Sequence, residues 1–379
     1  MNTVPSKIKP IAIYLPQFHP IPENDEWWGK GFTEWTNVAK AKPLFEGHYQ
    51  PHLPADLGFY DLRLAEIREA QATMARDNGI HGFCYYHYWF NGKRILERPF
   101  NEVLSTGKPD FPFMLCWANE NWTRIWDGGD KNVLLEQVYS AQDDIDHIRS
   151  LIPTFKDPRY IKVDGKPVFV VYRSTLLPDI KATITRWRNE ALKEGLEIYL
   201  CRMNTFGETG EKFLADGFDA AINFEPFGDK FEDFKTYLKS KKIKEKYTNW
   251  QLIHRLFSRS KRNELLNSLN AHVDYNEYVD FVKSYPNLNY KCYPGITPGW
   301  DNSARKKKGY FLFKNSTPLK FKDWLVHEVQ KFEPFSKDEN FLFINAWNEW
   351  AEGNHLEPDA KWGTQHLQAV KDVLNNSTV

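Results

Sequence analysis

Eight short apolar segments alternate with helical patterns along this chain of 379 residues. The segments cover residues 11–15, 82–86, 113–117, 168–172, 197–201, 220–224, 290–293 and 341–344. Their nearly continuous apolar character is typical of parallel strands that are buried on both faces. Eight repeats of strand and helix favour an α/β fold of the closed (β/α)₈ kind, the TIM barrel. The alternative is an open doubly wound sheet, which usually has a glycine-rich loop after its first strand, whereas PQFH follows here.

Helical patterns follow several of these segments, at 62–78, 143–155, 178–194, 321–332 and 365–374, with a shorter one at 209–216. We expect one catalytic barrel domain over residues 1–379. Two stretches are too long for ordinary connections, so we expect insertions at 18–60 after the first strand and at 228–289 after the sixth. The four cysteines lack CxxC spacing, which predicts buried thiols rather than a zinc site or disulfides.

The candidate site residues follow from the fold, because catalytic groups of a barrel lie at the carboxyl ends of its strands. The polar residues expected there are His19, His87, Asn119, Glu120, Arg173, Arg202, Asn204, Glu225, Asp301, Asn348, Glu349 and Glu352. Aromatic residues make up 16% of the chain, more than a core needs, and flat rings pack against the C–H faces of sugars. We therefore expect further substrate contacts from Glu34, Trp35, Trp89, Trp122, Trp126, Trp300, Trp347 and Trp350. Several carboxylates in an aromatic bowl predict glycosidic bond chemistry without a metal or cofactor.

The strongest catalytic candidates are Glu349 and Glu352 in the segment WNEWAEG at 347–353. They come directly after the last apolar segment, three residues apart, so both can reach one ligand. Burial between tryptophans and mutual repulsion raise carboxyl pKa values, as an acid that works near neutral pH requires. The other interpretation of this ExxE spacing is solvated surface charge.

Six segments carry a resemblance to a known family: IYLPQFH at 13–19, WWGKGFTEWTNV at 27–38, GHYQP at 47–51, YYHYWF at 85–90, WANENW at 117–122 and WNEWAEG at 347–353. Together they resemble the WbsX-type proteins, which are often described as glycosyltransferases and occur in O-antigen and capsule loci. These proteins are similar in turn to family 99 of the glycoside hydrolases, the endo-α-mannosidases, which are (β/α)₈ barrels. The second resemblance is strong only in the first strand and at 348–353.

The resemblance implies separate roles for the two glutamates. By motif position Glu349 would act as a base on the 2-hydroxyl of the substrate, or as a nucleophile, and Glu352 as the general acid and then base. The mannosidases usually carry His where this chain has Ala351, and that difference bears on the substrate.

Three functions stay open at this stage. The first is a retaining endo-type glycoside hydrolase that acts on a bacterial polysaccharide. The second is a glycosyltransferase or glycan-processing enzyme of lipopolysaccharide, O-antigen or capsule synthesis. The third is a glycan-binding barrel without catalysis, which would have no need of a costly pair of like charges. The sequence does not specify the sugar, the linkage or the oligomeric state.

The charge pattern bears on partners and location. Fifty basic and fifty acidic residues give no net charge, which argues against a nucleic-acid binder. Basic residues cluster at 230–262 and 305–308, either as a solvated face or as a patch for an anionic or lipid-linked glycan with peripheral membrane contact. No apolar run is long enough for a signal peptide or a membrane span, so we expect a cytoplasmic protein.

Overall fold

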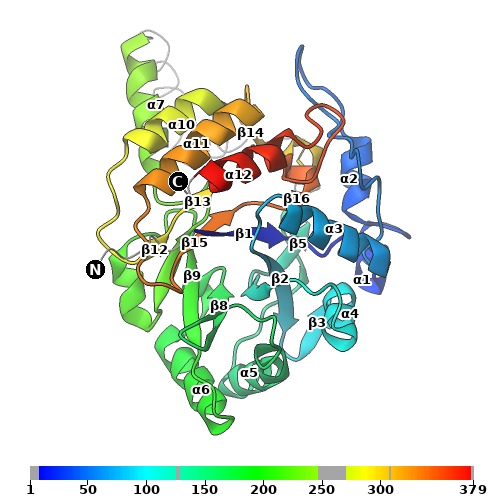
Figure 1. Cartoon of the computed structure of the whole chain (residues 1–379). Coiled ribbons are helices and arrows are strands. Elements are labelled where there is room, and N and C mark those ends of the chain that lie inside the picture. The colour runs from blue at the N-terminus through cyan, green and yellow to red at the C-terminus, as the bar shows by residue number, and fades with distance from the viewer. Residues whose placement is uncertain (1–7, 125–128, 246–269, 307–308, 377–379) are drawn as a thin grey trace.

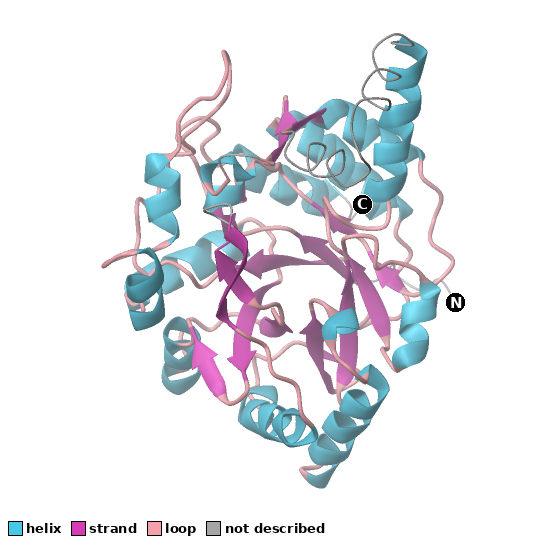
Figure 2. Ribbon diagram, turned by 180° about the vertical axis from the view of Figure 1, so that it is seen from behind, coloured by secondary structure: helices cyan, strands magenta, loops and turns pink. Residues whose placement is uncertain are grey.

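The computed structural model describes residues 8–124, 129–245, 270–306 and 309–376. All eight apolar segments form parallel strands of one sheet: β1 (Lys9–Tyr14), β2 (Gly82–Phe90), β4 (Phe113–Trp117), β8 (Lys166–Val171), β9 (Tyr199–Asn204), β10 (Ala220–Asn223), β12 (Cys292–Tyr293) and β15 (Phe341–Ile344). Neighbouring strands in the chain are neighbours in the sheet, and helices surround them (Figure 1 and Figure 2). The predicted α/β barrel is confirmed.

The sheet closes on itself through its seventh position. β1 pairs with β15, with Lys9 opposite Phe341, as a barrel requires. The seventh strand is split by Pro294, so β12 pairs with β10 while β13 (Gly295–Ile296) pairs with β15. Proline has no N–H to donate, but its carbonyl accepts a bond from the Phe343 amide at 2.9 Å, which joins the two halves to the ring.

The predicted helices are present as α3 (Ala65–Asp77), α5 (Ala141–Phe155), α6 (Ile180–Lys193), α11 (Pro318–Lys331) and α12 (Gln365–Asn376). The short pattern after the fifth strand is a 3₁₀ helix, η3 (Glu211–Asp216). Two further helices complete the outer layer: α4 (Arg98–Thr106) after β2, and α10 (Tyr275–Ser284) after β10. Since α10 buries Tyr278, Val279 and Val282 against the barrel, the end of the expected insertion at 228–289 belongs to the helical ring.

The connections at the carboxyl ends of the strands are long and partly ordered. The first insertion contains α1 (Pro22–Trp28) and α2 (Glu34–Lys40), and the described part of the second contains α7 (Phe231–Glu245) and β11 (Ala271–Asp274). Three antiparallel pairs and one parallel pair follow the strands: β2 with β3 (Lys93–Ile95), β5 (Trp122–Arg124) with β6 (Gly129–Leu135), β16 (Asn348–Glu349) with β17 (Asn354–His355), and β11 with β14 (Phe311–Lys314). At the other end, β7 (Lys162–Val163) pairs with the start of β8. No described helix has both the length and the apolar character that crossing a bilayer requires.

Candidate active site

The turn after β15 carries both candidate glutamates. It consists of β16, the 3₁₀ turn η5 (Trp350–Glu352) and β17. The Asn348 side chain exchanges two hydrogen bonds with the Leu15 backbone, at 2.8 and 3.0 Å, which fixes the turn to the end of β1. Gly353 ends η5 with φ 57°, and a Cβ atom there would meet the Asp301 Cβ at 2.9 Å, so only glycine fits. The turn therefore holds the two carboxyls in a defined place.

Arg305 binds three glutamates at this point. Its Nη2 atom lies 3.0 Å from Glu349 Oε2 and 2.5 Å from Glu34 Oε1, and its Nη1 atom lies 2.7 Å from Glu352 Oε1. Glu34 is fully buried at the start of α2, and the Ala351 amide donates to its Oε1 at 3.2 Å. One guanidinium thus joins the first insertion, the loop after the seventh strand and the turn after β15.

The electrostatics of this cluster favour retention of a proton. Burial raises the pKa of Glu349 and of Glu352; Arg305 opposes the shift, and the nearby carboxylates increase it. Burial alone would lower the pKa of Arg305, but Glu34, Glu352 and Glu349 raise it above its ordinary value. Burial beside other carboxylates therefore favours the protonated form of Glu349 and of Glu352, as a site for acid–base catalysis needs.

Both glutamates line a cavity of about 420 Å³ at the carboxyl ends of the strands. Its walls are mainly aromatic: Trp28, Tyr86, Tyr88, Trp122, Tyr172, Phe206, Phe224, Phe227, Trp300 and Phe311. Its polar groups include Gln17, Glu120, Asn121, Asn302, Arg305, Lys306, Asn345, Glu349 and Glu352. A cavity with flat apolar walls and a few convergent polar groups suits a polyhydroxylated ring.

Sequence comparison assigns the family. A model described as glycosyltransferase WbsX matches residues 10–370. The chain belongs to this family. WxcX from Xanthomonas campestris pv. campestris, described as an uncharacterized protein, is 40% identical over 378 residues in two strains, B100 and ATCC 33913. The match covers 99% of this chain and 50% of WxcX, so the chain spans about half the length of these relatives.

Solved structures with 13–14% identity share the fold. The GH99 endo-alpha-mannosidase from Bacteroides thetaiotaomicron, in complex with bis-tris-propane, has a TM-score of 0.55 with 14% identity and 97% of each chain covered. A second structure of that mannosidase has a TM-score of 0.56 with 13% identity, over 99% of this chain and 98% of the other. A glycoside hydrolase-like protein has a TM-score of 0.57 with 14% identity, over 99% of this chain and 96% of the other.

Five of the residues expected from the sequence line the cavity: Glu120, Trp122, Trp300, Glu349 and Glu352. Glu120 is held there by Arg173, whose Nη1 atom lies 2.6 Å from its Oε1. Asn119 is buried outside the cavity and exchanges two 2.8 Å hydrogen bonds with the Arg173 backbone. Asn119 and Arg173 therefore support the wall rather than line it.

The two expected residues of β2 turn away from the cavity. His87 Nε2 lies 3.0 Å from His147 Nε2, and Trp89 Nε1 donates to Asp143 at 2.9 Å, so both pack on α5. Burial lowers the pKa of His87 to about 3. Because side chains alternate along a strand, Tyr86 and Tyr88 face the cavity instead.

Arg202, Asn204 and Glu225 are buried in the barrel and do not line the cavity. The Arg202 guanidinium lies 4.1 Å from the centre of the Phe213 ring. Asn204 donates to Asp229 at 3.0 Å. Burial raises the pKa of Glu225 to about 7, and its carboxylate accepts bonds from neighbouring core side chains. Their polar ends contact residues of η3, of the loop before α7 and of α10, although their position after strands suggested substrate contacts.

The tryptophans expected around the turn after β15 are packing residues. Trp347 is fully buried, Trp350 donates from Nε1 to Glu357 at 2.6 Å, and Trp35 donates from Nε1 to the Tyr60 carbonyl at 2.8 Å. The side chains of Asn348 and Glu34 do not line the cavity; they hold the turn after β15 through the hydrogen bonds described above. Glu357, which the sequence interpretation missed, has its pKa raised to about 7 by burial.

Asp301 lies behind the turn rather than in the cavity. Its Oδ2 atom accepts from Gln50 at 2.8 Å and lies 2.7 Å from His48 Nε2. Its amide donates to the Glu352 carbonyl at 2.6 Å. Asp301 therefore links the first insertion to the residue that carries the second carboxyl.

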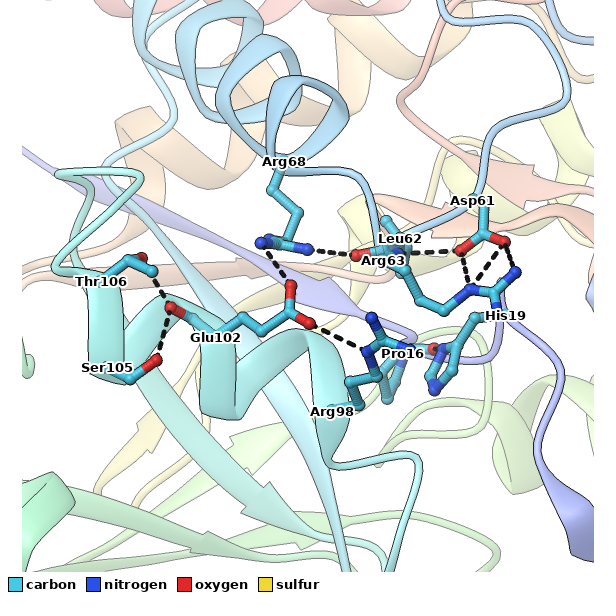
Figure 3. A network of polar contacts seen from close by, with 10 residues as sticks. All are labelled: Pro16, His19, Asp61, Leu62, Arg63, Arg68, Arg98, Glu102, Ser105 and Thr106. Carbon is cyan, nitrogen blue, oxygen red and sulfur yellow. Dashed lines mark hydrogen bonds and ion pairs between the residues drawn. The ribbon is translucent and has the colours of Figure 1, made fainter.

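His19 belongs to a polar network between β1, α3 and α4 (Figure 3). Its Nδ1 atom lies 3.1 Å from the Pro16 carbonyl, and burial lowers its pKa to about 4. In the same network Glu102 pairs with Arg68 at 2.8 Å and with Arg98 at 2.9 Å. His19 does not line the cavity, and Trp126 falls outside the described residues.

The basic segments are described only in part. Of the run at 305–308, Arg305 faces glutamates, Lys306 lines the cavity, and the other two residues fall outside the described part. Lys230 is buried, with its Nζ atom 3.5 Å from Glu328 Oε1, and much of 230–262 falls outside the described residues. An anionic substrate remains a prediction.

Proposed function

We propose that this chain is a glycan-processing enzyme, with retaining endo-type hydrolysis of a bacterial polysaccharide as its reaction. The observation that carries the proposal is the pairing of Glu349 and Glu352 with one guanidinium on the wall of an aromatic cavity. Glycoside cleavage needs one carboxyl to protonate the leaving oxygen and a second to act at the sugar carbon or its neighbour.

The two carboxyls differ in exposure, which supports the division of roles implied by the family resemblance. The Glu352 side chain is 18% exposed and the Glu349 side chain 8%. Glu352 in its acid form gives its proton to the glycosidic oxygen, and the leaving sugar departs as an alcohol. Glu349 takes the proton of the 2-hydroxyl, and that oxygen closes on the anomeric carbon. Water then attacks the anomeric carbon and opens the three-membered ring of this 1,2-anhydro sugar. The water loses a proton to Glu352, and Glu349 returns a proton to the oxygen at carbon 2.

Glycosyl transfer is the second candidate, favoured by the family description as glycosyltransferase. The same two steps give transfer when a sugar hydroxyl replaces water in the second one. The rings of Phe206 and Phe227 stack 5.0 Å apart on the cavity wall, beside Trp300, and offer an apolar surface for such an acceptor.

The experiment that tests the proposal follows the fate of the cleaved bond. Purified chain is incubated with O-antigen and capsule polysaccharides in ¹⁸O water, with and without short acceptor sugars. Hydrolysis gives new reducing ends that carry ¹⁸O, and transfer gives elongated acceptors that carry none. The Glu352→Gln variant serves as the inactive comparison, and Glu197→Gln is the matched control because Glu197 is 63% exposed and precedes β9 at the opposite end of the barrel. If wild-type products equal those of Glu352→Gln on every polysaccharide, the proposal is wrong.

A further inference from the structure

A second cavity of about 480 Å³ borders the one that contains Glu349. It is lined by the end of the first insertion and by the segment after the turn that follows β15, and Trp300 contributes to both cavities. Four histidines line it: His48, His52, His355 and His366. The reaction proposed above uses none of them.

Three side chains of this cavity converge on one point. His52 Nδ1 lies 3.0 Å from His355 Nε2, and His355 Nε2 lies 3.9 Å from Asp359 Oδ2. All three ligand atoms lie within 4.8 Å of one another. Tetrahedral zinc with bonds of about 2.0–2.2 Å places its ligand atoms about 3.3–3.6 Å apart, so small side-chain shifts would complete the geometry.

The lone pairs of His355 and Asp359 are set by their other contacts, whereas His52 would bind the ion through Nδ1 with its proton on Nε2. His355 Nδ1 lies 2.9 Å from the Glu357 carbonyl, which can only accept, so Nδ1 carries the proton and Nε2 presents a lone pair. The Oδ1 atom of Asp359 accepts from the Lys361 and Trp362 amides at 3.0 and 2.5 Å, which leaves Oδ2 toward His355. Such outer contacts are the ones that orient ligands in metal sites.

We propose that His52, His355 and Asp359 bind one divalent transition-metal ion, of which zinc is the best match. Two imidazole nitrogens and one carboxylate oxygen are a common zinc donor set, and a water molecule from the cavity supplies the fourth ligand. The sequence analysis expects no metal; His52 and His355 are 303 residues apart, and no sequence motif joins them.

The ion would hold the turn after β15 in place. His355 pairs with Asn348 across the β16–β17 hairpin, and its ring stacks on Trp350 at 3.8 Å and 12°. His52 belongs to the first insertion. Metal binding therefore ties that insertion to the hairpin that carries Glu349, and it is a positioning device rather than a catalytic centre.

The test measures metal binding by the full chain. After removal of metal with a chelator, the protein is titrated with Zn²⁺ against a chromophoric chelator, and Co²⁺ is used as a spectroscopic substitute. We expect one ion per chain, visible absorption bands of bound Co²⁺, and a higher melting temperature with Zn²⁺.

Three variants make the test specific. His52→Gln and Asp359→Asn should each weaken Zn²⁺ affinity at least about tenfold, since loss of even outer-shell partners costs about 10–100-fold. Asp359→Asn retains the Oδ1 acceptor and the side-chain volume, so its fold should persist, which circular dichroism checks. The matched control is His48→Gln, in the same cavity but paired with Asp301, and its affinity should stay within about threefold of wild type. Failure of the wild type to bind Zn²⁺ stoichiometrically would overturn the proposal, as would equal affinity of all variants. Either result would leave the glycosidic reaction untouched.

Discussion

Replacement of Arg305 by methionine tests the electrostatic account of the site. The change keeps a long apolar stem but removes the cation that binds Glu34, Glu349 and Glu352 at 2.5–3.0 Å. Leaving buried charges without their partner typically costs about 3–5 kcal/mol of unfolding free energy. The side chain of Arg305 is 10% exposed, so solvent offers the carboxylates little compensation.

The loss of unfolding free energy in Arg305→Met should increase as pH rises. Carboxyls of the unfolded chain titrate near pH 4.3, while burial raises the folded-state pKa values of Glu349 and Glu352. Without Arg305 these values rise further. Between the unfolded and folded pKa values the folded state binds more protons, so stability falls as pH rises. We therefore expect Arg305→Met to approach wild type near pH 5 and to lose about 3–5 kcal/mol near pH 8.

The assay is urea unfolding at pH 5 and pH 8. Arg149→Met is the matched control: it removes an Arg–Glu contact of 2.9 Å in which the arginine is 56% exposed, so about 0–1 kcal/mol is expected at both pH values. An equal loss for Arg305→Met at both pH values, or a loss at pH 8 no larger than that of the control, would refute the reasoning.

Two further predictions concern the cavity wall and the turn. Trp122→Ala removes an aromatic ring from the cavity wall and should raise KM about tenfold with little change in melting temperature. Trp89→Ala should instead lower the melting temperature, because Trp89 packs on α5. The opposite pattern would show that the cavity wall is misassigned. Gly353→Ala should destabilise the chain by about 1–3 kcal/mol in urea, because its φ is 57° and its Cβ would meet Asp301 at 2.9 Å; a change below about 0.5 kcal/mol would contradict the fixed turn.

The barrel could be predicted because each strand has a recognisable local sequence pattern. Apolar runs of four or five residues, separated by helical periodicity, fix the number and order of strands without long-range information. The helix α4 was missed because it is short, with nine residues, and begins with Arg98 and Pro99 directly after a hairpin. The helix α10 was hidden inside the segment 228–289, whose length suggested an insertion.

The site was only partly predictable, because residue type does not reveal which way a side chain points from its strand. In β2 the chemically attractive His87 and Trp89 point outward, while Tyr86 and Tyr88 line the cavity. The strand extends to Phe90, beyond the expected end at residue 86, and the alternation over this extension was the signal that could have found them.

Arg305 shows a second limit. It belongs to a run of four basic residues, which from sequence resembles surface charge. Its partners come from α2 and from the turn after β15, at sequence distances that no local pattern connects. The Glu349–Glu352 spacing, in contrast, could be interpreted directly because both residues lie in one short turn after a strand.

The most direct test of the central claim is the turnover of Glu349→Gln, Glu352→Gln and the double variant on the polysaccharide that the wild type cleaves or extends. Each single change should lower the rate at least about 10²-fold with an unaltered melting temperature, since general acid–base groups contribute about that much. The double variant should lose little more than the worse single one, because the two carboxyls act as a unit. Near-normal turnover of a well-folded double variant would contradict the assignment of this pair as the catalytic groups.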